Sequence, residues 1–317
     1  MSEPSKIDGA LVQWGERLFY PRNRIVRVAP PPRLAGTLAQ RAARIRSRIE
    51  ATVVRRAPQV MVKVTGGGRG MKAITAHFRY ISKNGRLDIE DEQGQVSRGR
   101  EAVRELAEDW RYGGTLIDDI SHRREAFNII LSMPRGTDPM SVLRSAREFA
   151  QAELADHKYV MVLHDHQANP HVHISVRAES KQGRRLNPCK ADLQRWRETF
   201  AEKLRGWGID AEASRQASRG VDRNYLSLWR KKAAEEGRER HPRPERKTGP
   251  NALTSRKDAG VAWANLFAAL RASDSSRDRG SAAAIERWVR ERSISRDVDK
   301  GPVERALEPR HGVEPRR

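Results

Sequence analysis

Four of the nine histidines in this 317-residue chain lie close together, in the stretch HDHQANPHVHISV from residue 164 to 176. His171 and His173 are separated by one residue, so on a β-strand both imidazoles emerge from the same face. His164 precedes the turn QANP, and an antiparallel hairpin brings the end of its strand alongside the other two. Three neutral imidazoles that converge in this way can bind one divalent ion and leave positions open for water or phosphate. The spacing therefore favours a metal site over histidines that merely lie on a polar face.

Two further polar residues of this stretch, Asp165 and His166, each have two interpretations. Asp165 is either an acceptor that orients a ligating imidazole or an ordinary turn residue. The residues alone do not decide between these roles, nor do they decide whether His166 belongs to the cluster.

A second candidate for chemistry is Tyr80, which lies in the stretch HFRYISKNGR. The cations Arg79, Lys83 and Arg86 flank it and favour its phenolate form, which is a nucleophile for a phosphodiester. A single tyrosine on a helix is more often a residue at the edge of the core. Composition alone leaves both interpretations open.

The glycine-rich stretch GGGRG, residues 66–70, separates a predicted strand from the predicted helix that carries Tyr80. Backbone N–H groups at the start of a helix can bind a phosphate, and Arg69 adds a cation there. The stretch lacks the GxxxxGK[ST] pattern of a nucleotide-binding loop. A phosphate site and a plain flexible loop therefore both fit.

The apolar patterns of the middle of the chain predict strands and helices in an irregular order. Alternating β-branched residues predict strands, and apolar residues at helical spacing predict helices. The predicted strands are 60–65, 125–133, 158–166 and 171–179, and the predicted helices are 71–83, 101–112, 140–154 and one within 186–208. Their order, with a hairpin near its end, predicts an α+β fold in which helices flank a central antiparallel sheet.

Changes in composition predict three parts of the chain. Residues 1–57 form a basic N-terminal extension, in which a basic helix over about 37–56 contacts phosphate rather than a core. Residues 58–235 form the folded domain. Residues 236–317 form a basic C-terminal region that begins with a linker rich in proline and arginine. That region is predicted to be largely disordered or helical, with helices at 259–272 and 282–293.

The charge and cysteine content narrow the function classes. The net charge of +21 suits a polyanionic partner, because each Lys or Arg on a phosphate releases a condensed counterion. Cys189 is the only cysteine, which excludes an internal disulfide or a CxxC zinc site and indicates a reducing compartment. No apolar run is long enough for a membrane span, and the first residues lack the apolar segment of a secretion signal. We therefore expect a cytoplasmic protein that is not inserted in a membrane.

Three stretches, taken in order, resemble motifs of the relaxase or mobilisation nuclease family, the HUH-type enzymes that include MobA-like proteins and T-DNA border endonucleases. VMVKVTGGGRGMKAITAHFRYISKNGRLDIED (60–91) resembles the motif with the nucleophilic tyrosine. NIILSMPRGTDPMSVLRSAREFA (128–150) resembles the second block, and HDHQANPHVHISVRAE (164–179) resembles the motif with the metal-binding histidines. The stretch GIDAEASRQASRGV (208–221) is also similar to the family. The resemblance covers the chain from about residue 59 to residue 230.

The resemblance implies a role for each of the residues that match. It makes Tyr80 the nucleophile and His164, His171 and His173 the ligands of a divalent ion, Mg²⁺ or Mn²⁺. Relatives often have an aspartate two positions after the first histidine, where this chain has His166. Either His166 replaces that residue as a base, or Asp165 reaches the site from the other face.

The implied activity is that of a DNA relaxase. The tyrosine attacks single-stranded DNA at a transfer origin, forms a 5′-phosphotyrosyl bond, and so starts conjugative mobilisation of a plasmid. Arg69, Arg79, Lys83 and Arg86 are the predicted DNA-binding residues. The resemblance further implies accessory mobilisation proteins and a secretion coupling protein as candidate partners, and transfer of the protein with the DNA into a recipient cell.

Two other functions fit the same pattern. One is a replication initiator nuclease of rolling-circle plasmids, and the other is a non-catalytic single-stranded DNA-binding protein of the same fold. Trp196 and Trp207 are either residues that stack on DNA bases or members of the core.

Overall fold

A computed structural model of the chain describes residues 5–20, 34–221, 233–238, 244 and 246–292. The chain folds into two compact units. One consists of residues 57–213, here called the sheet domain, and the other combines both ends of the chain, residues 1–56 and 214–317, here called the helical unit. The last part of the resemblance, from residue 222, and the end of the second predicted C-terminal helix lie outside the described residues. Among the described helices, none is both long and apolar enough to cross a membrane.

The sheet domain contains one six-stranded sheet in which all neighbouring strands are antiparallel. The strands are β1 (Met61–Gly66), β2 (Ile89–Asp91), β3 (Val96–Ser97), β4 (Ala126–Ser132), β5 (His157–His164) and β6 (His171–Ser180), in the spatial order β1-β4-β6-β5-β2-β3. The predicted α+β fold with a central antiparallel sheet is confirmed. The sequence analysis missed β2 and β3, because strands of three and two residues are too short to show an alternating pattern.

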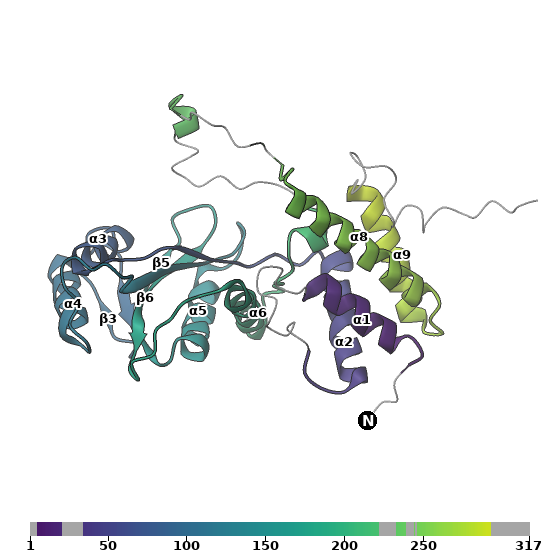
Figure 1. Cartoon of the computed structure of the whole chain (residues 1–317), viewed down its shortest axis with the longest axis horizontal. Coiled ribbons are helices and arrows are strands. Elements are labelled where there is room, and N and C mark those ends of the chain that lie inside the picture. The colour runs from purple at the N-terminus through teal and green to yellow at the C-terminus, as the bar shows by residue number, and fades with distance from the viewer. Residues whose placement is uncertain (1–4, 21–33, 222–232, 239–243, 245, 293–317) are drawn as a thin grey trace, which may run out of the picture. The chain divides into compact units, whose positions relative to one another are not determined.

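Helices cover both faces of the sheet, and the alternation of side chains along the strands decides which residues meet which helices (Figure 1). Phe127, Ile129 and Leu131 of β4 pack with α5 (Pro139–Glu153) and α6 (Lys190–Gly206). Val160 and Val162 of β5 point the other way and pack with α3 (Met71–Ile81) and α4 (Arg100–Tyr112). His164, two residues further along β5, therefore faces α3.

The chain leaves α3 through a tight left-handed turn. Lys83, Asn84 and Gly85 have φ angles of 50°, 58° and 80° in succession. The side chain of Ser82 accepts a hydrogen bond from the Gly85 N–H at 3.0 Å. A side chain at Gly85 would meet the backbone of Gly99, since an added Cβ would lie 2.3 Å from the Gly99 carbonyl carbon. Glycine is thus required here both for its backbone angle and for its close contact.

The helical unit has a core of its own, which differs from the expectation of two separate extensions. Its helices are α1 (Asp8–Phe19), α2 (Leu38–Ile49), α8 (Pro250–Arg271) and α9 (Ser276–Arg292), with a π-helical turn at Glu50–Val54 and a 3₁₀ turn at Ala217–Arg219. Ile45 of α2 is buried with Trp263 of α8 and Trp288 of α9. The basic helix therefore belongs to a core, and α8 begins at residue 250, within the predicted linker.

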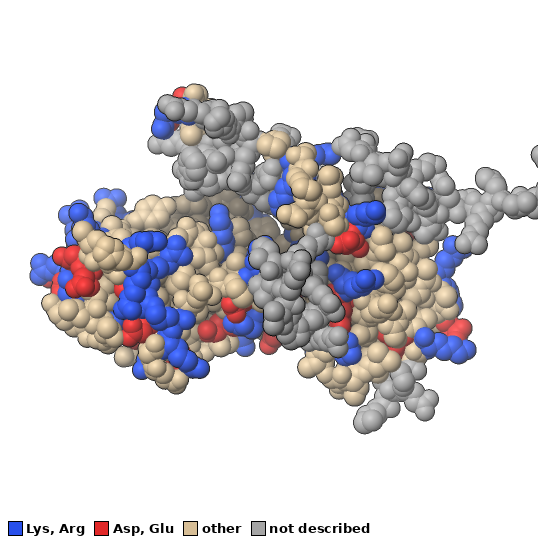
Figure 2. Space-filling model, in the orientation of Figure 1, with Lys and Arg blue, Asp and Glu red and all other residues tan. Residues whose placement is uncertain are grey.

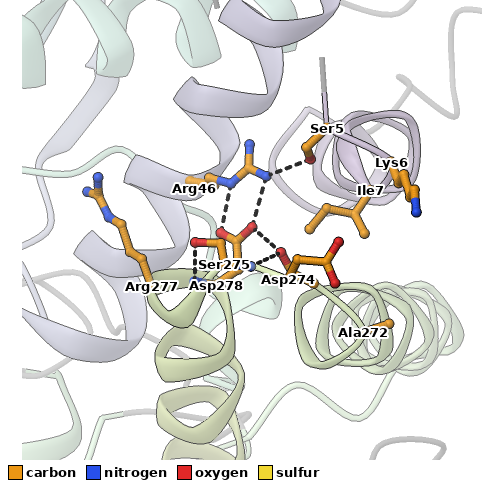
Figure 3. Close-up of a pocket in the computed structure, with 10 residues that line it drawn as sticks. Ser5, Lys6, Ile7, Arg46, Ala272, Asp274, Ser275, Arg277 and Asp278 are labelled. Atoms are coloured by element: carbon orange, nitrogen blue, oxygen red, sulfur yellow. Dashed lines mark hydrogen bonds and ion pairs between the residues drawn. The ribbon is translucent and has the colours of Figure 1, made fainter. Parts of the chain in front are cut away.

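An ion-pair network joins the two chain ends inside the helical unit (Figure 3). Arg46 of α2 donates to the buried Asp8 at 2.8 Å and to both carboxylate oxygens of the buried Asp278 at 2.8 and 3.0 Å. The hydrogen bonds to Asp278 raise the pKa of Arg46, and burial opposes this effect. Arg46 and Asp278 also line a pocket together with Ser5 and Ser273, and two carboxylates already pair with the guanidinium of Arg46 there.

We expect the substitution Gly85→Ala to lower the free energy of unfolding by roughly 1–3 kcal/mol, because alanine is strained at this φ and its Cβ meets Gly99. Gly94→Ala is the matched control, since Gly94 has a φ of 81° and open space around it. Thermal and urea unfolding followed by circular dichroism would measure both losses. Equal losses for the two variants would show that the approach to Gly99 imposes no constraint.

Candidate active site

The three histidines of the predicted cluster converge at one end of the β5–β6 hairpin. The register of the hairpin places His164 directly opposite His171. His173 lies two residues further along β6, on the same face. All three side chains are buried, and one ring nitrogen from each lies within 4.8 Å of the others. The structure thus brings together the residues that the spacing singled out.

Backbone carbonyl groups fix the orientation of two of these rings. Nε2 of His164 lies 2.7 Å from the carbonyl oxygen of Ile81, and Nδ1 of His171 lies 2.9 Å from the carbonyl oxygen of Asn169. A carbonyl only accepts hydrogen bonds, so these two nitrogens carry the protons and Nδ1 of His164 and Nε2 of His171 keep their lone pairs.

The donor atoms of the cluster fit a divalent transition ion. Nδ1 of His164 and Nδ1 of His173 are buried and have no hydrogen-bond partner among the described residues. Ligating imidazoles characteristically donate their other N–H to a carbonyl or carboxylate group, as His164 and His171 do here. The three histidines therefore offer free lone pairs to a metal ion. Two of them also donate their other N–H to a carbonyl group, as ligating imidazoles do.

Burial keeps these imidazoles uncharged. Desolvation lowers the pKa of His164 and His171, and it lowers the pKa of His173 to about 3, with the neighbouring His164 and His171 adding to the effect. Neutral imidazole is the form that binds a metal ion, so protons compete poorly for this site near neutral pH.

Tyr80 lies beside the cluster, on the last turn of α3. Its ring centroid is 6.3 Å from that of His173 in an edge-to-face arrangement. The next residue, Ile81, supplies the carbonyl oxygen that binds His164. The side chain of Tyr80 is 66% exposed, so its phenol is open to a substrate. The predicted nucleophile and three potential metal ligands are therefore adjacent.

Comparison with known proteins finds relatives of the sheet domain. Residues 80–209 match the family model of the MobA/VirD2-like relaxase nuclease domain. Over these residues the chain is similar to this relaxase family. It is 24% identical over 184 residues to the T-DNA border endonuclease VirD2 of Rhizobium radiobacter and to that of Agrobacterium fabrum strain C58. The match covers 51% of this chain and 43% and 41% of the two relatives, so the chain spans about two fifths of their length.

The four cations predicted to bind DNA lie at two separate places in the sheet domain. Arg79, Lys83 and Arg86 are exposed on or just after the end of α3 that carries the tyrosine. Arg69 precedes the other end of this 11-residue helix, about 16 Å away at 1.5 Å per residue, and donates to the carbonyl oxygen of His122. Three of the four cations therefore lie at the end of α3 that carries Tyr80.

The glycine-rich stretch of the sheet domain, residues 66–70, is not an open phosphate site. The first N–H groups of α3, those of Met71 and Lys72, donate to the carbonyl oxygens of Asp118 and Asp119 at 2.9 and 3.2 Å. Gly70 has a φ of 94°, and an added Cβ would lie 2.4 Å from the Asp119 oxygen. The glycines thus permit a close backbone contact, so the interpretation as a phosphate site is wrong, and so is that of a flexible loop.

The two uncertain residues of the hairpin turn lie outside the buried cluster. Asp165 is exposed and makes no hydrogen bond or ion pair with another described residue. The orienting role considered for it is filled by the carbonyls of Ile81 and Asn169. His166 is also exposed, with its ring centroid 5.2 Å from that of His164. A base at this position is compatible with that distance and stays a prediction.

The structure also adds a residue that the sequence analysis did not single out. His77 lies one turn before Tyr80 on α3, with its ring centroid 6.1 Å from that of Tyr80 and 6.3 Å from that of His173. Its Nε2 is buried without a hydrogen-bond partner, and desolvation lowers its pKa to about 4. The only signal in the sequence is the spacing of three residues between His77 and Tyr80, which places both on one face of a helix.

The two tryptophans considered for stacking on DNA lie in the layer of α5 and α6, across the sheet from the cluster. Trp196 is fully buried among Phe149 and its neighbours and belongs to the core. Trp207 follows α6 and is 42% exposed, with the guanidinium of Arg144 5.0 Å from its ring centroid. Neither ring lies on the face of the sheet that is covered by α3, the helix that carries Tyr80.

The lowered pKa values of the three buried histidines predict that metal binding persists in mild acid. Three imidazoles with the usual pKa near 6.5 would lose roughly a thousandfold in affinity for an ion at pH 5.5. Because burial lowers the pKa of all three imidazoles, we expect Mn²⁺ affinity, measured by calorimetry, to fall by much less than a thousandfold between pH 7.5 and pH 5.5. A loss near a thousandfold would contradict the burial argument.

Proposed function

We propose that this chain is a DNA relaxase that nicks one strand at a transfer origin and starts conjugative mobilisation. The observation that carries the proposal is the position of Tyr80, whose exposed ring lies 6.3 Å from His173 on a helix end that is hydrogen-bonded to His164. The match of residues 80–209 to a relaxase nuclease domain supports it, as does the similarity to two T-DNA border endonucleases.

The chemistry is a transesterification. The phenol oxygen of Tyr80 forms a bond to the scissile phosphorus, and the bond from phosphorus to the 3′ oxygen breaks. The phenol loses its proton to a base or to water, and the departing 3′ oxygen gains one. The products are a 5′-phosphotyrosyl linkage and a free 3′-hydroxyl, and the same site can rejoin the ends in the reverse direction.

His164, His171 and His173 would hold the divalent ion of this reaction. When bound, such an ion stabilises the negative charge that develops on the phosphate oxygens. The sequence analysis expected Mg²⁺ or Mn²⁺, and three imidazole ligands favour Mn²⁺, because Mg²⁺ prefers oxygen ligands. The role of this chain's own residues is to present neutral, oriented imidazoles next to the tyrosine.

The distribution of charge supports a local mode of DNA binding. Residues 57–213 contain 25 Lys and Arg and 22 Asp and Glu, so the relaxase domain carries only +3 of the net charge of +21. Figure 2 shows positive and negative side chains interspersed on this domain. We propose that single-stranded DNA reaches the site along Arg79, Lys83 and Arg86, and that the basic remainder of the chain binds flanking DNA, accessory mobilisation proteins or a secretion coupling protein.

The first test is covalent capture of DNA. Overlapping oligonucleotides from both strands of the DNA that flanks the coding gene would be incubated with the full chain and Mn²⁺, and adducts would be detected on denaturing gels. We expect Tyr80→Phe to abolish the adduct, because phenylalanine lacks the attacking oxygen. Tyr112→Phe is the matched control, since Tyr112 is exposed to the same degree, 67%, on another helix end of the domain.

Three results would contradict the proposal in different ways. An adduct with Tyr80→Phe would assign the nucleophile to another residue. Binding of the oligonucleotides without any adduct in the wild type would indicate a non-catalytic DNA-binding protein. Adducts only with oligonucleotides from a replication origin would favour the rolling-circle initiator.

The second test concerns the phosphate contacts. We expect Lys83→Gln and Arg86→Gln each to weaken binding of a single-stranded oligonucleotide and to reduce the slope of log K against log salt by about 0.7, the contribution of one phosphate contact on a single strand. The control is Lys190→Gln, an exposed lysine at the start of α6 in the opposite layer. Fluorescence anisotropy between 50 and 300 mM salt would give the slopes, and unchanged slopes would place the DNA elsewhere.

A further inference from the structure

His77 has no role in the reaction as described so far, although it lies inside the site. The ring centroids of His77, Tyr80 and His173 form a nearly equilateral triangle, with sides of 6.1, 6.3 and 6.3 Å. The nucleophile and one potential metal ligand occupy two of its corners. A group held between Tyr80 and His173 therefore also lies next to His77.

One ring nitrogen of His77 lacks a hydrogen-bond partner. Its Nε2 is shielded from water and has no partner among the described residues. Burial of a polar nitrogen without a partner is unfavourable. The two other unpartnered buried ring nitrogens nearby, Nδ1 of His164 and Nδ1 of His173, belong to the potential metal ligands. A partner for Nε2 of His77 therefore has to enter the same site and displace the atoms that cover this nitrogen.

We propose that His77 binds the scissile phosphodiester by donating a hydrogen bond from Nε2 to a non-bridging phosphate oxygen. The contact holds the phosphorus between the phenol of Tyr80 and the three histidines. This inference rests on the proposed function, because it assigns a substrate contact within that reaction. His77 acts here as a hydrogen-bond donor and not as a metal ligand, since its ring nitrogens are not among those that lie within 4.8 Å of one another.

Two substitutions separate the hydrogen bond from the shape of the ring. His77→Phe keeps a planar ring on α3 but removes both nitrogens, whereas His77→Gln keeps an N–H donor near the position of Nε2. We expect His77→Phe to slow adduct formation at saturating oligonucleotide by roughly a hundredfold, as the loss of one donor to a developing oxyanion does in other enzymes. We expect His77→Gln to recover most of that loss. His122→Gln, at an exposed histidine, is the matched control.

A stereospecific probe tests the contact itself. The oligonucleotide that the wild type cleaves would be prepared with one or the other non-bridging oxygen of the scissile phosphate replaced by sulfur, which is a poor hydrogen-bond acceptor. The wild type should distinguish the two diastereomers, and His77→Phe should lose the part of this preference that comes from the oxygen bound by His77. A variant that only perturbs the fold would slow both diastereomers equally.

Metal binding and folding are measured on the same variants. His77→Phe and His77→Gln should bind Mn²⁺ as the wild type does and should melt near its temperature. Loss of Mn²⁺ binding in His77→Phe would make His77 a ligand and overturn the inference, as would a wild-type rate or an unchanged preference between diastereomers. In all these cases the wild type still forms its adduct. If the wild type forms none, the proposed function fails and this inference fails with it.

Discussion

The hydrogen bond between Nε2 of His164 and the carbonyl oxygen of Ile81 connects the parts of the candidate site. The carbonyl belongs to the last turn of α3, where helical carbonyls have no partner within the helix. By accepting from His164 it satisfies the end of the helix and also fixes the proton of the imidazole on Nε2. The same bond places Tyr80, the residue before Ile81, beside the three histidines. The position of Tyr80 and the free lone pair of His164 thus depend on one contact of 2.7 Å.

The left-handed turn after α3 supports this contact. The N–H groups of Lys83 and Asn84 donate to the carbonyls of Tyr80 and Arg79, so the turn occupies the neighbouring helix carbonyls and leaves that of Ile81 for His164. Gly85 then packs against Gly99, which directs the chain into β2. A continued helix would bond the Ile81 carbonyl to its own backbone, and His164 would lose the acceptor that sets its tautomer.

Local patterns predicted the parts of the fold and site that depend on neighbours in the sequence. The alternation in β6 and the single residue between His171 and His173 were sufficient to predict the strand and the shared face of both imidazoles. Tyr80 required the resemblance to a family, because its own neighbours fit a core-edge residue equally well. His77 was missed because its distinguishing feature is a nitrogen without a partner, which only the packed structure shows.

The wrong predictions for the start of α3 and for α2 have a common physical cause. In both cases the decisive contacts are made by segments that are distant in the sequence. The start of α3 resembles a phosphate site until the carbonyls of Asp118 and Asp119, nearly fifty residues later, occupy its N–H groups. The arginines of α2 hide the narrow apolar stripe of Ala42, Ile45 and Ile49, which becomes a core surface only where α8 and α9 cover it.

The net charge of the whole chain also did not show where the excess positive charge lies, because opposite charges nearly cancel within the sheet domain. A nearly neutral domain has little non-specific attraction to DNA, so the proposed function would depend on the few cations beside Tyr80 and on groups that contact the phosphate directly. In that proposal the short distances between Tyr80, His77 and the three histidines matter more for recognition than the overall charge does.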